Sequence, residues 1–441
     1  MNPTALTLTA LAAAYRDGSL RPTEVVEAYL DRIDVGPVYR AVTARRARHQ
    51  AERAEADFAA GVDRGPLQGV PIALKDLMDT AGEVTAAGSA VLAEGTAAPA
   101  DCPAARRLDA AGVVFLGKTG MTELAFGGIG TNPHFGTPGC ALDSQRVPGG
   151  SSSGSGVAVA AGLACAAIGS DTGGSVRIPA AFNGIVGLKT TDGAIPMEGC
   201  VPLSPTLDTL GPLARTVPDA WHLWRGLADL PPMPFPGAPL GHLSLLAPTQ
   251  LLRDVDPEVE RGFEVAWDRL QAAGHRIERR NVPLLDEISV LYERHGTFAG
   301  IEGFSLHRQL LERDEGGMDP RVSTRILRYR DRTPDDYARL VEGRERIRGD
   351  FEELAGGYDA IVAPTVAILP PRIADLASDE AYLDANARVL RNTQVFNFLG
   401  CPAASVPCRR TAGRLSIGFM VATRPDEEEL ALRIAALAST A

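Results

Sequence analysis

The chain has 441 residues, of which 45% are hydrophobic, so it is long enough to bury one large core or two to three smaller ones. Its formal net charge is −11 and it carries no block of basic residues. This balance argues against a nucleic-acid or anionic-membrane surface and favours a small-molecule partner. The six cysteines and seven histidines show no metal-like spacing, so the sequence predicts reduced cysteines and no metal site.

Membrane association is not expected either. The apolar stretches, such as 157–168, are too short to span a bilayer. The first residues, MNPT, lack the basic start and the apolar core of a signal peptide. We therefore expect a soluble protein that resides in the cytoplasm.

The first half of the chain alternates short apolar strands with helical segments. The predicted elements, in chain order, are helices at 7–16 and 23–34, a strand at 69–76, a helix at 104–111, a strand at 113–116 and a helix at 157–168. The strand at 69–76 carries Lys75 close to its end. This alternation predicts an α/β layered architecture.

The composition changes at a Pro-rich segment, 230–241. After it, charged helical segments are expected at about 257–273 and 286–355. Short apolar segments at 360–363, 403–406 and 415–421 are predicted as further strands of a central sheet. The Pro-rich segment is therefore not interpreted as a domain boundary.

Two runs of small residues predict an active site: GGSSSGSG at 149–156 and GSDTGGSVR at 169–177. Glycine lets backbone N–H groups approach a ligand closely, and serine supplies a hydroxyl that can act as nucleophile or proton relay. Such runs are often flexible linkers. The twelve apolar, helix-compatible residues at 157–168 between the two runs argue against a linker here.

Only three of the 44 basic residues are lysine, namely Lys75, Lys118 and Lys189. Arginine cannot lose its proton in a protein, whereas a buried lysine can be neutral and act as a base. This scarcity supports a special role for one of the three without establishing it.

Three familiar motifs match formally and fail on context. GVVFLGKT at 112–119 fits the P-loop formula, but its middle residues are predicted as a buried strand and cannot wrap phosphates. GSSSG at 150–154 fits a nucleophile elbow with Ser152 as nucleophile, but the preceding residues are polar and end in proline, unlike the strand that an elbow follows. KTG at 118–120 is typical of β-lactamases, yet no S-x-x-K occurs.

With these motifs excluded, the chain closely resembles the amidase signature family. The matching segments are GVPIALKD at 69–76, GKTGMTELA at 117–125 and the block 148–189, with weaker similarity at 358–364 and 400–407. The resemblance implies one amidase domain over 1–441, with a signature core at about 65–220 and pocket walls from the later part. It also implies a central mixed β-sheet covered by α-helices on both faces, and no cofactor.

The resemblance assigns three catalytic residues. Ser175 matches the nucleophile that becomes acylated, Ser151 the bridging serine that follows a cis peptide bond, and Lys75 the base. The two serines lie 24 positions apart, as the family pattern requires. The implied reaction is hydrolysis of a carbon–nitrogen amide bond of a small molecule through an acyl-enzyme. Lys118 and Lys189 match family positions that have no catalytic role.

Further residues would support this chemistry. The backbone N–H groups expected to form the oxyanion hole are those of Thr172, Gly173, Gly174 and Ser175. A tight structural turn would favour the same glycines. The residues expected to brace the nucleophile loop by hydrogen bonds or an ion pair are Asp171, Arg177 and Ser152.

Substrate contacts are expected at Met121, Gly150, Arg344 and Tyr329. Arg344 and Tyr329, together with Arg325, would hold an acidic group of the substrate. A solvated helix face explains the same arginines equally well.

Three alternatives stay open: the glutaminase subunit of a tRNA-dependent amidotransferase, a hydrolase of urea-like substrates such as carboxybiuret or allophanate, and an inactive binding scaffold. Arg344 falls where the glutaminase subunit places an arginine for the glutamine α-carboxylate, but Leu390 occupies the place of the acidic partner for the α-amino group. A buried ammonium without a carboxylate binds poorly. The sequence therefore favours a free-standing amidase, and the resemblance allows for a homodimer.

Overall fold

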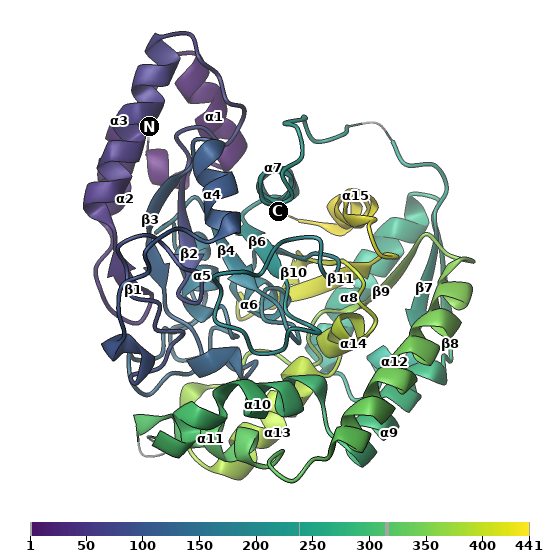
Figure 1. Ribbon diagram of the computed structural model, residues 1–441. Coiled ribbons are helices and arrows are strands. Elements are labelled where there is room, and N and C mark those ends of the chain that lie inside the picture. Colours follow the sequence, from purple (N-terminus) through teal and green to yellow (C-terminus); the bar gives the residue numbers. More distant parts are fainter. Residues whose placement is uncertain (1, 238, 314–316, 441) are drawn as a thin grey trace.

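A computed structural model describes residues 2–237, 239–313 and 317–440, and the strands in these ranges form one mixed sheet (Figure 1). The strands are β1 Tyr39–Val42, β2 Pro71–Lys75, β3 Val114–Thr119, β4 Ala166–Ser170, β5 Val186–Lys189, β6 Leu210–Ala214, β7 Ser244–Pro248, β8 Arg276–Arg280, β9 Ala360–Pro364, β10 Ala403–Arg410 and β11 Ser416–Ala422. Their order across the sheet is β1-β3-β2-β4-β6-β5-β10-β11-β9-β7-β8.

Parallel pairing occurs in two separate parts of the sheet. Strand β2 runs parallel to β3 and β4, and β7 runs parallel to β8 and β9. The strands between these two groups pair antiparallel, and β10 joins β5 to β11. Strands from both sides of the Pro-rich segment 230–241 therefore belong to the same sheet, as expected from the sequence.

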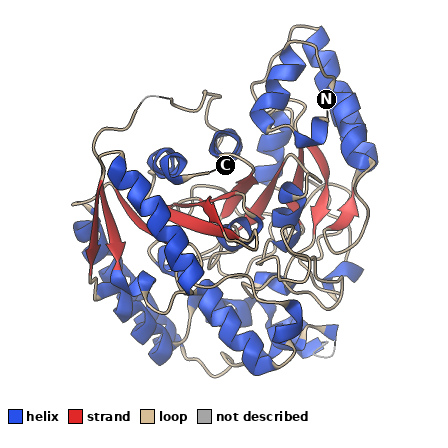
Figure 2. Ribbon diagram, turned by 180° about the vertical axis from the view of Figure 1, so that it is seen from behind, coloured by secondary structure: helices blue, strands red, loops and turns tan. Residues whose placement is uncertain are grey.

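Helices cover both faces of the sheet (Figure 2). They are α1 Leu8–Arg16, α2 Pro22–Leu30, α3 Ala44–Ala59, α4 Pro103–Ala110, α5 Ser153–Ala160, α6 Arg177–Asn183, α7 Val217–Leu227, α8 Pro257–Ala272, α9 Leu284–His295, α10 Phe298–Arg313, α11 Pro320–Leu327, α12 Pro334–Ala355, α13 Asp379–Leu390, α14 Thr393–Phe398 and α15 Glu428–Ala438. Helices α7, α8 and α15 pack together on one face, and α5 and α6 pack on the other. Within the described ranges, none of these helices has the length and hydropathy needed to span a bilayer.

The helix starts follow from local capping. The side chain of Thr7 accepts a hydrogen bond from the N–H of Ala10 and begins α1 where the sequence predicts it. Thr333 and Asp336 form a capping box that begins α12. The charged segment predicted as helical at 286–355 consists of the four helices α9 to α12, and 314–316 lie outside the described residues.

The predicted helix at 157–168 is wrong in its second half. Helix α5 ends at Ala160, Gly162 adopts a φ of +68°, and β4 begins at Ala166. A short apolar run fits a buried strand as well as a buried helix, so periodicity alone could not separate the two. The left-handed conformation at Gly162, which glycine adopts readily, separates the helix from the strand.

The arrangement of β2 and β4 positions the site. The two strands are parallel, with Leu74 opposite Ile168, so their carboxyl ends lie at one edge of the sheet. Lys75 is the last residue of β2, and Ser170 is the last residue of β4. The loop 171–176 then leads directly into α6. Ligand sites of α/β sheets form at such carboxyl ends.

The core depends on contacts between β11 and α8. Phe419 is fully buried and stacks on Phe263, with ring centroids 5.2 Å apart and 16° between the ring planes.

We expect Phe419→Ala to lower the free energy of unfolding by about 3–5 kcal/mol, because it leaves a cavity in the core. Urea denaturation would measure this loss. Leu437→Ala, at a side chain that is 38% exposed, is the control, with a loss below about 0.5 kcal/mol. Equal losses for the two variants would contradict this account of the core.

Candidate active site

Lys75 lies fully buried at the edge of the sheet and contacts two serine hydroxyls. Its Nζ lies 2.6 Å from Ser151 Oγ and 2.8 Å from Ser170 Oγ. The sequence prediction included Ser151 and assigned no role to Ser170. Recognising β4 as a strand parallel to β2 would have placed Ser170 beside Lys75.

Burial lowers the pKa of Lys75 to about 7, because the charged ammonium is poorly solvated there. The negative charges of Asp171 and Asp208 oppose this shift, and burial outweighs them. A substantial fraction of Lys75 is therefore neutral near pH 7. A neutral amine has a lone pair that can accept a proton from a hydroxyl.

The segment that carries Ser151 is fixed by its backbone. The peptide bond between Gly150 and Ser151 is cis. The N–H of Gly150 donates to the carbonyl oxygen of Gly128 at 2.8 Å, and the N–H of Thr122 donates to the carbonyl oxygen of Ser151 at 3.2 Å. The N–H of Ser152 donates to the carbonyl oxygen of Ser175 at 3.2 Å, which brings the two Ser/Gly runs together.

The loop 171–176, called the nucleophile loop because the sequence predicts Ser175 as the nucleophile, has a row of backbone N–H groups without acceptors in the described part of the chain. The N–H groups of Thr172, Gly173, Gly174 and Ser175 form no hydrogen bond with the described residues. Buried N–H groups are nearly always paired, so a row of free ones marks a place for a ligand oxygen. Gly174 has a φ of +135°, and a Cβ there would collide with Thr393. The loop therefore requires glycine at this position.

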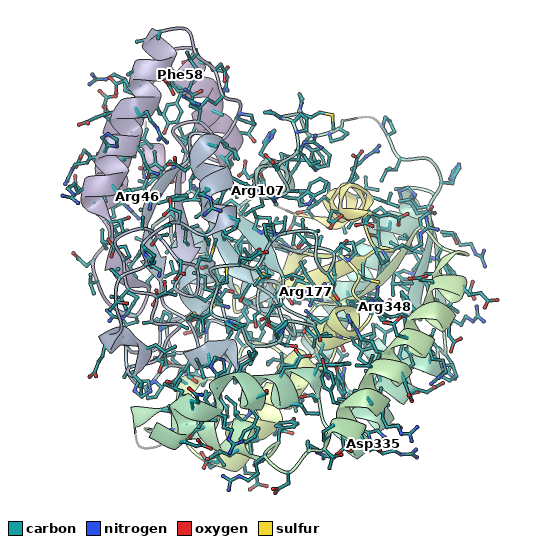
Figure 3. The ribbon with its side chains drawn as sticks, viewed as in Figure 1. Arg46, Phe58, Arg107, Arg177, Asp335 and Arg348 are labelled. Atoms are coloured by element: carbon teal, nitrogen blue, oxygen red, sulfur yellow. The ribbon has the colours of Figure 1, made fainter. Side chains whose placement is uncertain are left out.

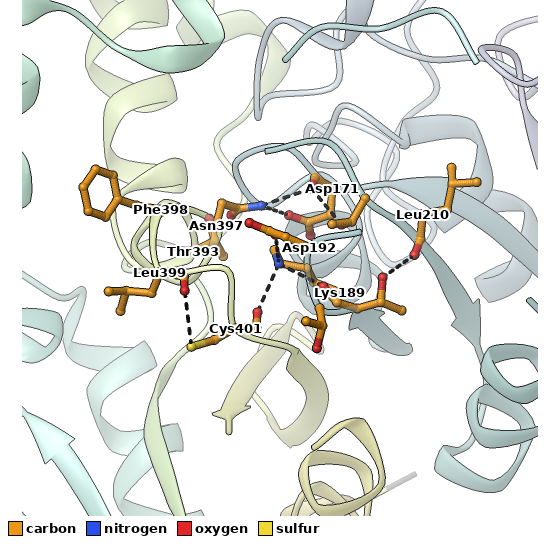
Figure 4. A network of polar contacts seen from close by, with 12 residues as sticks. Asp171, Lys189, Asp192, Leu210, Thr393, Asn397, Phe398, Leu399 and Cys401 are labelled. Atoms are coloured by element: carbon orange, nitrogen blue, oxygen red, sulfur yellow. Dashed lines mark hydrogen bonds and ion pairs between the residues drawn. The ribbon is translucent and has the colours of Figure 1, made fainter. Parts of the chain in front are cut away.

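A buried ion pair and a hydrogen bond from Asn397 hold Asp171, and Figure 4 shows the contact between Asn397 and Asp171. Arg177 Nη2 lies 2.9 Å from Asp171 Oδ1, and both side chains are inaccessible to solvent. Asn397 Nδ2 donates to the same carboxylate oxygen at 2.9 Å, and Thr393 Oγ1 donates to the carbonyl oxygen of Gly173 at 2.6 Å. Figure 3 shows Arg177 in the interior of the molecule.

The sequence predicted the two ends of this ion pair as loop supports, but not Thr393 or Asn397. Both lie on α14, more than two hundred residues beyond the loop that they hold. No local motif marks them.

A second buried carboxylate, Asp208, holds the other side of the loop. Its Oδ1 accepts a hydrogen bond from Thr172 Oγ1 at 2.5 Å, and its Oδ2 accepts from the N–H groups of Leu203 and Ser204 at 2.8 and 2.9 Å. Burial raises the pKa of Asp208 to about 6, against the effect of these hydrogen bonds. Asp208 thus connects the nucleophile loop to the segment that contains Leu203. The sequence prediction missed it.

A cavity of about 160 Å³ adjoins the nucleophile loop. Its polar lining includes Ser175, Thr172, Thr297, Arg325, Tyr329 and Gln394. Ser175 is only 2% exposed, so a substrate reaches it through this cavity. Leu203, Leu207 and Leu390 contribute apolar surface to the lining.

Of the residues that the sequence predicts to contact the substrate, one lines this cavity and the others do not. Tyr329 lines the cavity, and its hydroxyl lies 3.2 Å from Thr297 Oγ1. In the described part of the chain, Met121, Gly150 and Arg344 are not among the lining residues. Met121 is buried, and its carbonyl oxygen accepts a hydrogen bond from Asn132.

Arg344 has structural partners instead. Its Nη2 lies 2.6 Å from Asp192 Oδ2, and its Nε donates to the carbonyl oxygen of Phe398 at 2.7 Å. These contacts attach α12 to the chain around α14. The guanidinium is therefore already paired within the protein, and the contact of Arg344 with the substrate stays a prediction.

The other two lysines are also paired. Lys118 Nζ lies 2.9 Å from Asp76 Oδ1, and both side chains are buried. Lys189 Nζ lies 3.1 Å from Asp192 Oδ1 and donates to the carbonyl oxygen of Cys401 at 3.1 Å. Both ammonium groups are therefore bound to carboxylates, unlike that of Lys75, whose hydrogen-bond partners are serine hydroxyls. In the described ranges, no group of His, Cys, Asp and Glu side chains is arranged to hold a metal ion.

The comparison with known families agrees with this geometry. A family model described as Amidase matches residues 24–236 and 237–432. The chain belongs to the amidase family, and it is an amide-hydrolysing enzyme.

Curated relatives and solved structures resemble nearly the whole chain. It is 36% identical to 2-amino-5-chloromuconic acid deaminase of Comamonas testosteroni, with 90% of this chain and 87% of that protein covered. It is 34% identical to one subunit of the glutamyl-tRNA(Gln) amidotransferase of Symbiobacterium thermophilum, with coverage of 95% and 93%. A crystal structure of an amidase superposes with a TM-score of 0.87 at 29% identity, covering 98% of this chain and 99% of the other.

The buried ion pair predicts a large effect of a small change. Asp171→Asn removes the charge partner of Arg177 and leaves a buried guanidinium uncompensated. We expect the free energy of unfolding, measured by urea denaturation, to fall by about 3–5 kcal/mol.

Asp63→Asn is the matched control, because Asp63 pairs with Arg16 at the surface, where the side chains are 49% and 34% exposed. Its expected loss is below about 1 kcal/mol. If Asp171→Asn loses no more stability than this control, the ion pair does not brace the loop.

Proposed function

We propose that the chain is a free-standing serine amidase that hydrolyses small amides with Ser175 as nucleophile, Ser151 as relay and Lys75 as base. The observation that carries the proposal is the 2.6 Å contact between Lys75 Nζ and Ser151 Oγ, in a lysine that has no carboxylate partner among the described residues. The backbone contact between Ser152 and Ser175 supports it, because it holds the relay segment against the nucleophile loop.

The first half of the reaction forms an acyl-enzyme. Ser175 Oγ attacks the amide carbonyl carbon and gives its proton to Ser151, while Ser151 gives its own proton to Lys75. The negative charge that develops on the carbonyl oxygen is stabilised by the free N–H groups of 172–175. The carbon–nitrogen bond then breaks as the proton returns along the relay to the leaving nitrogen, which departs as ammonia or an amine.

The second half returns the enzyme to its starting state. A water molecule gives a proton to the same relay and attacks the acyl carbon, and the same N–H groups stabilise the second tetrahedral intermediate. The bond to Ser175 Oγ breaks and the serine regains its proton, which leaves a carboxylic acid that releases its own proton to solvent and departs as a carboxylate. We propose that one domain performs both halves, because strands from both ends of the chain share the sheet that carries the site.

Two observations favour a free-standing enzyme over the amidotransferase component that one relative is named for. Arg344, the expected partner of a glutamine α-carboxylate, is paired with Asp192. Leu390, at the place of the acidic partner for the α-amino group, contributes apolar surface to the cavity. The name of the Comamonas testosteroni relative points to a small organic acid as substrate.

A fluorophosphonate probe tests the nucleophile. We expect covalent labelling of the wild type and of Ser152→Ala, and none of Ser175→Ala. Labelling that survives Ser175→Ala but not Ser152→Ala would identify the elbow serine as the nucleophile. A wild type that stays unlabelled and cleaves no amide would support the binding-scaffold alternative.

The lowered pKa of Lys75 predicts the pH dependence of the free enzyme. The neutral amine is the active form, so kcat/KM rises with pH through about 7 and levels off above it. Lys75→Arg cannot supply a neutral base and should lose about 10²–10⁴ in kcat/KM. Initial rates across the pH range measure both effects. A pH-independent kcat/KM in the wild type would contradict this role of Lys75.

A further inference from the structure

One cationic side chain in the substrate cavity is not yet explained. Arg325, on α11, lines the cavity together with Ser175. Its Nη1 donates to the carbonyl oxygen of Phe126 at 2.8 Å, and its guanidinium carbon lies 4.5 Å from the centroid of the Phe126 ring. These contacts fix the orientation of the guanidinium without neutralising its charge.

No carboxylate pairs with Arg325 among the described residues, and no Asp or Glu is among the residues that line the cavity. Burial lowers the pKa of Arg325, and the opposing effects of Tyr382, Tyr329 and Asp319 offset it only in part. Two fully or mostly buried arginines near the site are paired, Arg177 with Asp171 and Arg344 with Asp192. An unpaired charge that is poorly solvated is costly, and an anionic ligand would relieve that cost.

The neighbouring cavity groups suit a carboxylate. Tyr329 and Thr297 place two hydroxyls on the lining, 3.2 Å from each other, and Gln394 adds an amide. Hydroxyl and amide groups can donate hydrogen bonds to carboxylate oxygens, and the planar guanidinium fits a carboxylate with two parallel bonds.

We propose that Arg325 binds a carboxylate of the substrate, so that the enzyme acts on the monoamides of small dicarboxylic acids. The amide carbonyl would lie at Ser175 and the carboxylate at Arg325. A cavity of about 150 Å³ holds one benzene molecule, so the cavity here accepts a ligand on the order of six to eight non-hydrogen atoms. This proposal rests on the proposed function, since it names the substrate class of the same site.

Matched substrates test the proposal. Malonamate, succinamate and glutaramate would be compared with isovaleramide, 4-methylpentanamide and 5-methylhexanamide, in which an isopropyl group replaces the carboxylate. We expect the wild type to favour each acid over its neutral partner in kcat/KM. In Arg325→Ala this ratio should fall by about 10- to 100-fold, mostly through KM, because one charge-assisted pair is lost. Arg325→Lys keeps the charge and should recover part of the ratio.

Arg328→Ala is the matched control, since Arg328 follows α11 by one residue and its side chain is exposed. We expect it to leave the acid-to-neutral ratio within about twofold of the wild type. A wild type with no preference for the acids, or an Arg325→Ala variant that loses activity on acids and neutral amides equally, would overturn the proposal.

Calorimetric titration with succinate separates this proposal from the reaction mechanism, because it needs no turnover. We expect binding to the wild type and to Ser175→Ala, and binding weaker by at least about tenfold in Arg325→Ala. If succinate binds in this pattern but no amide is hydrolysed, the serine mechanism fails and the carboxylate site stands. If amides are hydrolysed but succinate binds Arg325→Ala as tightly as it binds the wild type, the carboxylate site fails and the serine mechanism stands.

Discussion

The site depends on a primary amine that is buried beside hydroxyl groups and not beside carboxylates. In the described part of the chain, Lys75 has Ser151 and Ser170 as its hydrogen-bond partners, and no ion pair. A carboxylate in contact would hold the ammonium form and remove the lone pair. The nearby carboxylates of Asp171 and Asp208 are each bound to several other donors, which keeps them in place as supports of the nucleophile loop.

The predictions from sequence were confirmed where secondary structure and fold class leave a local pattern in the chain. Lys75 ends a short apolar strand, and the prediction of that strand was confirmed. The fold class was also confirmed, because alternating strands and helices leave a strong local pattern. β4 was mistaken for the end of a helix, because a buried parallel strand and a buried helix are both continuously apolar.

The parts that the sequence did not predict are contacts between distant segments. Ser170 meets Lys75 only after two strands pair, and Asp208 meets Thr172 across a segment of 36 residues that contains α6 and β5. The ion pair between Arg344 and Asp192 is another contact between distant segments that the sequence did not predict. Whether a charged residue is paired within the protein depends on which distant segments pack against it, and a local sequence pattern does not show this.

The hydrogen bonds from Thr393 and Asn397 to the loop at 171–176 also concern the order of biosynthesis. The ribosome makes this loop more than two hundred residues before it makes the two side chains that hold it. The native conformation of the loop therefore depends on a part of the polypeptide that is synthesised late.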